Sequence, residues 1–156
     1  MALSRDDTVD VLNDLLETCY DGLEGFRAAV SRVEGSQAIA LFQSRVQRID
    51  EGAAELYTAI RRLGGRPAEH GHRQAILHRG WMHLVHAAAP HGDAAILAEV
   101  ERGEEEAVRR YRHAARKSLP PDLHDLVDDQ LRGAEENLER VRELRALAKQ
   151  ASPPAT

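Results

Sequence analysis

The chain has 156 residues, of which 42% are hydrophobic and 30% charged, and it carries a formal net charge of −5. This length suits one domain with a single core, and the acidic balance gives no basis for nucleic-acid binding. One cysteine allows neither an internal disulfide nor a thiolate metal site, which fits a reducing cytoplasm. No stretch reaches the roughly 18 consecutive apolar residues of a membrane span, so we expect no membrane partner and a cytoplasmic location.

The first half of the chain predicts two long helices. Ser4 and the acids after it are typical of a helix start, and apolar residues then recur at three- and four-residue steps as far as Val33. Gly35 interrupts this stripe, and residues 39–63 repeat the same spacing in a second one, which includes Phe42, Val46 and Ile49. Gly64, followed by a second glycine and a proline, predicts the end of the second helix.

The second half predicts a short helix and then two long ones. Residues 72–89 carry a short apolar stripe that ends at a proline. Asp93 suits the N-cap of a long helix that extends to about Ala115. Pro121 suits the first position of the last helix, whose apolar stripe covers residues 123–147.

Four long helices of similar length indicate an all-α, ferritin-like antiparallel four-helix bundle. Short links join the first two and the last two helices, while a link of nearly thirty residues with its own helix separates the pairs. Such a link can cross the whole bundle, which favours a helical crossover between two hairpins over a plain up-down-up-down bundle. We expect one domain over residues 1–150 and a disordered tail over residues 151–156.

Glycines and acids coincide near the middle of the long helices. Glycine inside a helix costs about 1 kcal/mol relative to alanine, so these positions need a reason. The mid-helix glycines are Gly22, Gly25, Gly52, Gly103 and Gly133. Each has a glutamate beside it, and Glu104 also falls on the apolar seam of its helix, which predicts that it points inward. Because mid-helix positions of an antiparallel bundle lie at one level, this slice is the main functional candidate.

The acids at this level suggest a di-metal carboxylate site for iron or manganese. The candidate ligands are Glu24, Glu51, Glu55, Glu101, Glu104 and Glu135. Bundle proteins build such sites from single glutamates and Glu-x-x-His pairs, whereas the only Glu-x-x-His here, Glu69 to His72, falls in the long link. In the alternative interpretation, Glu104 pairs with an arginine or with the amides of Gln130 or Asn137, and the other acids are solvated.

Two further features have simpler interpretations than a functional site. Six of the eight histidines lie between His70 and His91, where His83 and His86 could share a helical face as metal ligands. Exposed histidines of the crossover are the alternative that we favour. Cys19 lies on the apolar stripe of the first helix and is expected to be a buried core residue.

Several short motifs resemble a bacterial family of ferritin-like four-helix-bundle proteins that is defined as a domain of unknown function. The residues that carry the resemblance are Leu12-Asn13-Asp14-Leu15, Asp21-Gly22-Leu23-Glu24-Gly25-Phe26-Arg27, Leu63-Gly64-Gly65, Leu77-His78-Arg79-Gly80-Trp81, Glu101-Arg102-Gly103-Glu104 and Tyr111-Arg112. The resemblance covers nearly the whole chain, and it implies the ferritin-like fold and a bacterial cytoplasmic setting but no reaction.

The sequence contains no complete catalytic set, so we expect no enzyme activity and no cofactor. The favoured function is a non-enzymatic structural or interaction module, with a homo-oligomer as its expected partner. The alternative is a degenerate di-metal carboxylate protein that binds iron, with ferroxidase-like chemistry. A third hypothesis is a small ligand in the space that the glycines leave, which a fully packed middle of the bundle would exclude.

Overall fold

The computed structural model describes residues 1–69 and 92–151 of the chain. These residues form the helices α1 (Arg5–Val30), α2 (Ser36–Arg62), α4 (Asp93–Ala115) and α5 (Pro121–Ala151). The helix predicted over residues 72–89, the six histidines from His70 to His91 and the last five residues of the predicted tail lie outside the described residues. The extent of the domain, residues 1–150, stays a prediction.

The helix ends follow the signals in the sequence. The Ser4 hydroxyl accepts a hydrogen bond from the backbone N–H of Asp7 at 3.0 Å and so caps α1. At the end of α2, Gly64 adopts a φ of 76°, which a residue with a side chain rarely takes. The N–H of Gly65 then donates to the carbonyl of Ile60 at 2.9 Å, which completes a Schellman motif. Pro121 is the first residue of α5, as predicted.

Asp93 binds the turn before α2 and does not cap its own helix, as the sequence suggests it would. Gly92 occupies the N-cap of α4, and Asp93 is the first helical residue, so the predicted N-cap role is wrong. The Asp93 carboxylate instead accepts hydrogen bonds from the backbone N–H groups of Glu34 and Gly35, at 3.0 and 2.7 Å. Gly35 has no side chain with which to cap α2 itself. Asp93 therefore fixes the start of α4 to the start of α2.

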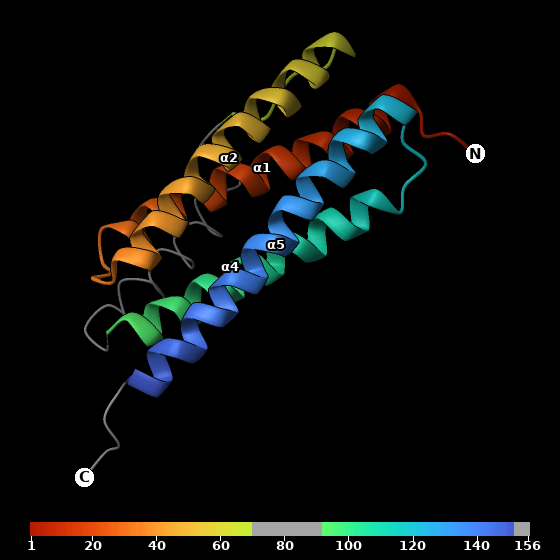
Figure 1. Ribbon diagram of the computed structural model, residues 1–156. Coiled ribbons are helices and arrows are strands. Elements are labelled where there is room, and N and C mark those ends of the chain that lie inside the picture. The colour runs from red at the N-terminus through yellow and green to blue at the C-terminus, as the bar shows by residue number, and fades with distance from the viewer. Residues whose placement is uncertain (70–91, 152–156) are drawn as a thin grey trace.

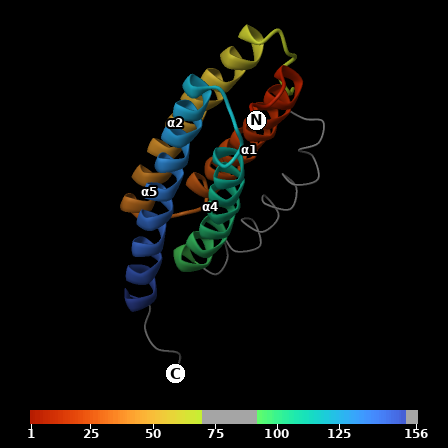
Figure 2. The same cartoon turned by 90° about the vertical axis from the view of Figure 1, so that its right-hand side faces the viewer.

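These contacts establish the topology of the bundle. Since α2 and α4 start at the same end, they run parallel, and the link between them begins and ends at opposite ends of the bundle (Figure 1). The N–H of Leu3 bonds the carbonyl of Ser118 at 3.2 Å, so α1 and α4 are antiparallel neighbours. Figure 2 shows α1 beside α4 and α2 beside α5. The predicted crossover between two hairpins is confirmed, and an up-down-up-down arrangement is excluded.

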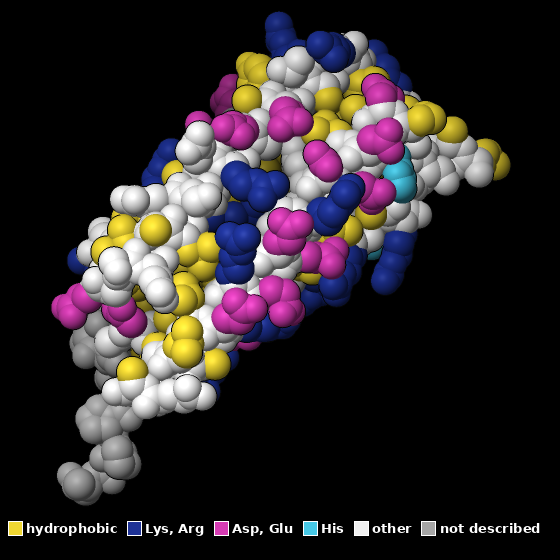
Figure 3. Space-filling model, viewed as in Figure 1, with side chains coloured by type: hydrophobic (Ala, Val, Ile, Leu, Met, Phe, Trp, Pro, Cys, Tyr) yellow, Lys and Arg dark blue, Asp and Glu magenta, His cyan; other side chains and the backbone are white. Residues whose placement is uncertain are grey.

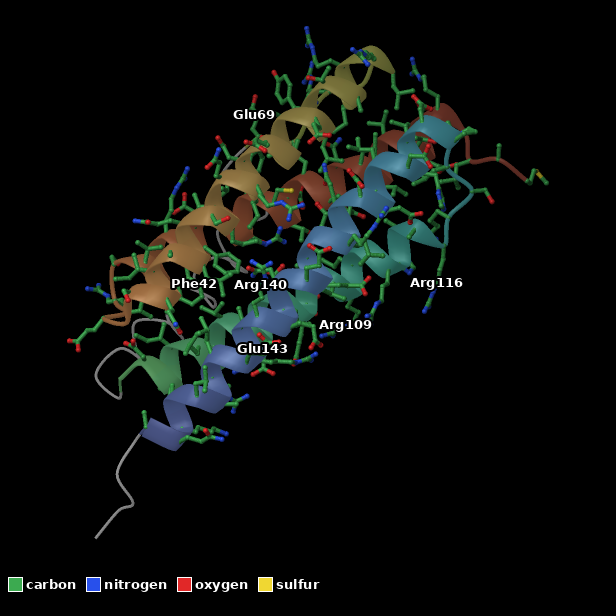
Figure 4. The ribbon with its side chains drawn as sticks, viewed as in Figure 1. Phe42, Glu69, Arg109, Arg116, Arg140 and Glu143 are labelled. Atoms are coloured by element: carbon green, nitrogen blue, oxygen red, sulfur yellow. The ribbon has the colours of Figure 1, made fainter. Side chains whose placement is uncertain are left out.

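The apolar stripes of all four helices meet in one main core, and Val108, Ala134 and Leu138 form a small second cluster between α4 and α5. Fully buried side chains include Leu12, Leu16, Phe42, Leu56, Ile60, Ile96, Val100, Val127 and Val141. Phe26 of α1 and Phe42 of α2, the latter labelled in Figure 4, pack edge to face with ring centroids 5.6 Å apart. Within the described ranges, no helix is long and apolar enough to cross a membrane.

Candidate functional site: a polar pocket in the middle of the bundle

A cavity of about 350 Å³ lies in the middle of the bundle and is lined by all four helices. One glycine from each helix lines it, namely Gly22, Gly52, Gly103 and Gly133. The prediction that the mid-helix glycines lie at one level is therefore confirmed for these four. The middle of the bundle is not fully packed, so the hypothesis of a small ligand at this level survives.

Two of these glycines make room for polar side chains of the facing helix. A Cβ on Gly52 of α2 would lie 3.2 Å from Nε2 of Gln130, which comes from α5. A Cβ on Gly133 of α5 would lie 3.0 Å from Nη2 of Arg48, which comes from α2. Gln130 and Arg48 therefore cross between α2 and α5 in opposite directions, each lying over a glycine.

The pocket reaches solvent between α2 and α5. Its exposed lining residues are Arg48, Glu51 and Glu55 of α2 and Asp129 of α5. The lining residues of α1 and α4 are buried or half-buried. Figure 3 shows basic side chains gathered midway along this face, between α2 and α5. We call this opening the α2/α5 mouth.

A buried ion pair forms the deepest part of the pocket. Nη2 of Arg45 donates to Oε1 of Glu104 at 2.6 Å, and the two side chains are only 9% and 2% exposed. Burial raises the pKa of the Glu104 carboxyl, against the opposing effects of the Arg45 charge and of the nearby Asn137 side chain. Asn137 Nδ2 nevertheless lacks a hydrogen bond of good geometry to the described residues. The inward orientation of Glu104 is confirmed, and an arginine neutralises it.

The burial of Arg45 was not predicted from the sequence, although a signal was present. Phe42, Arg45, Ile49, Gly52 and Leu56 follow one another at three- and four-residue steps, and all five are buried. The sequence-based stripe assigned Val46 to the core in place of Arg45. The seam argument that identified Glu104 would have identified Arg45 too.

A directed chain of hydrogen bonds crosses the pocket beside this ion pair. The Tyr111 hydroxyl donates to Oε1 of Gln130 at 2.7 Å, and Nε2 of Gln130 donates to the Gly52 carbonyl at 3.1 Å. Because the single Tyr111 proton is used, the Cys19 thiol donates to the Tyr111 oxygen across 3.3 Å. Burial raises the pKa of Cys19 to about 11, so the thiol stays protonated at neutral pH. The chain links α1, α4, α5 and α2 in that order.

The structure brings together three of the six acids predicted as metal ligands. Glu51, Glu55 and Glu104 line the pocket, whereas Glu24, Glu101 and Glu135 do not. Glu24 is half-buried on α1, and Glu51 accepts a hydrogen bond from Gln47 at 3.3 Å.

The remaining two predicted ligands have arginine partners. Glu101 is buried against Arg142 and Arg145 of α5, and Arg112 approaches Glu135 at 3.6 Å. Burial alone would raise the pKa of Glu101, but the hydrogen bonds and charges of Arg145 and Arg142 lower it below its ordinary value. Both acids are therefore neutralised within the protein.

The donor groups that the structure describes do not fit a di-metal centre. Among residues 1–69 and 92–151, no three His, Cys, Asp or Glu side chains converge as metal ligands would. The Arg45 guanidinium contacts Glu104, the most deeply buried of the predicted ligands. We derive no metal chemistry from this arrangement, and the metal-site assignment stays a prediction.

The fold and the site define a ferritin-like four-helix bundle with a polar pocket at its centre. A model of the family described as a domain of unknown function (DUF2383) matches residues 7–117, and the chain belongs to that family. No curated protein matches the chain.

Similar solved structures include three bacterial proteins. The first is a two-domain protein from Anabaena variabilis with DJ-1/ThiJ/PfpI-like and ferritin-like domains, at a TM-score of 0.80 and 14% identity; the match covers 99% of this chain and 40% of that one. The second is a ferritin-like diiron-carboxylate protein from Bacillus anthracis, at a TM-score of 0.67 and 16% identity. The match covers 93% of this chain and 99% of that one. The third is a dodecameric thioferritin from Bacteroides fragilis, at a TM-score of 0.73 and 17% identity. The match covers 95% of this chain and 90% of that one. At these identities the similarity establishes the fold.

Proposed function

We propose that this protein is a non-enzymatic binding module whose central pocket holds a small organic molecule. The observation that carries the proposal is a cavity of about 350 Å³ at the level where each of four helices contributes a glycine. Ligand pockets in proteins generally start at about 300 Å³ and combine apolar walls with a few convergent polar groups. Here Phe26 and Ile49 supply apolar wall, and Arg45 and Gln130 supply polar groups.

A thermal-shift screen against a library of small metabolites tests this proposal. Ala107→Leu adds a larger apolar side chain to the pocket wall, and Ala54→Leu makes the same change on an exposed part of α2 outside the pocket. Compounds that stabilise the wild type should stabilise Ala54→Leu equally and lose their effect on Ala107→Leu. A library without any stabilising compound, or hits that Ala107→Leu leaves unchanged, would refute the pocket as a binding site.

Iron binding is the second candidate, and the similarity to a diiron-carboxylate protein and to a thioferritin supports it. The ligands would come from the acids named above, of which Glu51 and Glu55 are exposed at the α2/α5 mouth. The Arg45–Glu104 pair counts against it, because a metal at Glu104 would have to displace a buried guanidinium. Elemental analysis and ferrous-iron titration of untagged protein decide: the absence of stoichiometric iron or manganese and of iron uptake eliminates this candidate.

We also propose that the protein acts in the cytoplasm as a homo-oligomer. The dodecameric assembly of the similar thioferritin supports self-association, and the lone buried thiol suits a reducing compartment. Light scattering coupled to size-exclusion chromatography measures the assembly directly. A mass equal to one chain at all concentrations would overturn the oligomer.

A further inference from the structure

The wall that α2 contributes to the pocket changes its charge along the helix. Arg45 and Arg48 line the pocket before Gly52, and Glu51 and Glu55 line it next to and after Gly52. At a rise of 1.5 Å per residue, the centres of the two pairs lie about 10 Å apart along the axis. Side chains of one helix tilt in the same direction, so their charged groups keep a similar spacing.

The facing helix places a further acid at the same end. Gln130 lies over Gly52 and Arg48 lies over Gly133, so α5 runs antiparallel to α2 at this level. Asp129 therefore lies beside the glutamate end of the α2 wall, and it also lines the pocket. The α2/α5 side of the pocket thus has a basic end and an acidic end.

The basic end has hydrogen-bond donors to spare. Arg45 is more than nine-tenths buried, and its Nη2 binds Glu104, but its Nε has no hydrogen-bond partner in the described part of the chain. The nearest carboxylate contact of Arg48 is Glu136 at 3.9 Å, which is longer than a hydrogen bond. Two guanidinium groups thus face one buried carboxylate, so a second carboxylate would balance the charge here.

At the acidic end, Asp129 has an exposed partner in Arg132 at 3.5 Å, but no ion pair among the described residues involves Glu51 or Glu55. The third lining arginine, Arg110, binds Glu106 at 3.0 Å and contacts the Thr18 hydroxyl at 3.4 Å. Glu55 and its neighbours at the α2/α5 mouth therefore hold negative charge that a ligand ammonium would offset. Between the two ends, Ile49 and Ala107 offer apolar contacts to a carbon chain, and Phe26 adds apolar wall beside the basic end.

We propose that the pocket binds a small zwitterion whose ammonium and carboxylate are separated by a short carbon chain. The carboxylate lies between Arg45 and Arg48, and the ammonium lies among Glu51, Glu55 and Asp129. This assignment rests on the proposed function, since it names the chemical class of the ligand in the same pocket. The roughly 10 Å between the charged pairs favours a linear amino-carboxylate over an α-amino acid, whose two charges share one carbon.

Calorimetric titration of the full chain with a matched series of ligands tests this inference. The series is 6-aminohexanoate, hexanoate and hexylamine, which share the carbon chain and differ in charge. We expect saturable binding of 6-aminohexanoate, and binding at least about tenfold weaker for each single-charge analogue, because each leaves one end of the pocket unpaired. Failure of 6-aminohexanoate to bind, or equal binding of all three compounds, would overturn the zwitterion.

Two exposed variants check which end of the ligand each charge contacts. Arg48→Gln should weaken 6-aminohexanoate and hexanoate and leave hexylamine unchanged. Glu55→Gln should weaken 6-aminohexanoate and hexylamine and leave hexanoate unchanged. Arg61→Gln, an exposed position on α2 outside the pocket, is the control and should change none of the three. Equal effects of all three substitutions would indicate nonspecific charge attraction and refute the assignment.

The screen and the titration separate the two levels of the proposal. If Ala107→Leu abolishes binding of library compounds but the zwitterion binds no better than its analogues, the pocket function stands and the ligand class is wrong. If no library compound and no member of the series binds, the pocket function and the ligand class are both wrong.

Discussion

Arg45→Met should destabilise the protein strongly, because it leaves Glu104 buried without its ion-pair partner. The substitution keeps the apolar stem of the side chain and removes the guanidinium. Glu104 is 2% exposed, and Arg45, at 2.6 Å, is its only ion-pair partner in the described ranges. Breaking one side of a buried pair typically costs about 3–5 kcal/mol, so we expect a loss of that size in the free energy of unfolding at neutral pH.

The pH dependence and a double variant test the same reasoning. Burial already raises the pKa of Glu104, and loss of Arg45 should raise it further. The loss in Arg45→Met should therefore shrink as the pH falls and the carboxyl is protonated. Arg45→Met combined with Glu104→Leu should recover wild-type stability or exceed it, because an apolar pair incurs no desolvation penalty.

Urea unfolding followed by far-ultraviolet circular dichroism measures all three proteins. A loss below about 1 kcal/mol in Arg45→Met would be typical of an exposed ion pair and would refute the buried arrangement. A double variant no more stable than Arg45→Met would contradict the attribution of the cost to an unpaired carboxylate.

Four further substitutions test other parts of the structure. In urea unfolding, Gly133→Ala should be neutral or stabilise the protein by up to about 1 kcal/mol, because only the flexible end of the exposed Arg48 must move. Gly52→Ala should destabilise the protein, because it displaces the hydrogen-bonded Gln130. If Gly133→Ala were less stable than Gly52→Ala, the positions of Arg48 over Gly133 and of Gln130 over Gly52 would be refuted. Burial raises the pKa of Cys19 from 9.0 to about 11, which favours the protonated thiol in the folded state. The contribution of this thiol to the free energy of unfolding is therefore complete below pH 9 and is lost as the pH rises towards 11. The wild type should thus lose at most about 3 kcal/mol more than Cys19→Ala over that range, and parallel unfolding curves would contradict the buried thiol. Asp93→Ala should lower the thermal midpoint by an amount equivalent to about 1 kcal/mol, because it removes two hydrogen bonds to the turn before α2, and an unchanged midpoint would contradict that role.

The fold was largely predictable because local signals agreed with the final packing. Ser4, Gly64 and Pro121 each mark a helix end through chemistry that acts within a few residues. The burial of Glu104 was predictable too, because a strict 3-4 spacing places it on the seam. The length of the link before Asp93 was enough to favour the crossover topology.

The parts that failed depend on contacts between helices, which spacing along one helix cannot give. Asp93 looks like a cap for its own helix, and only the shared end of α2 and α4 explains why it binds the turn before α2. The glycines were predicted to mark a functional level, but their packing role depends on the register that sets Gln130 over Gly52. Arg45 was missed because its neighbour Val46 fits an apolar stripe equally well.

The central claim is that the middle of the bundle is a ligand pocket, and nuclear magnetic resonance tests it most directly. A ¹⁵N–¹H correlation spectrum recorded during titration with 6-aminohexanoate or a screening hit reports on the backbone amides of Gly22, Gly52, Gly103 and Gly133, one from each helix. The account predicts that the largest shift changes converge on these four amides and follow one binding curve. Shift changes confined to the helix ends or to one outer face would contradict it.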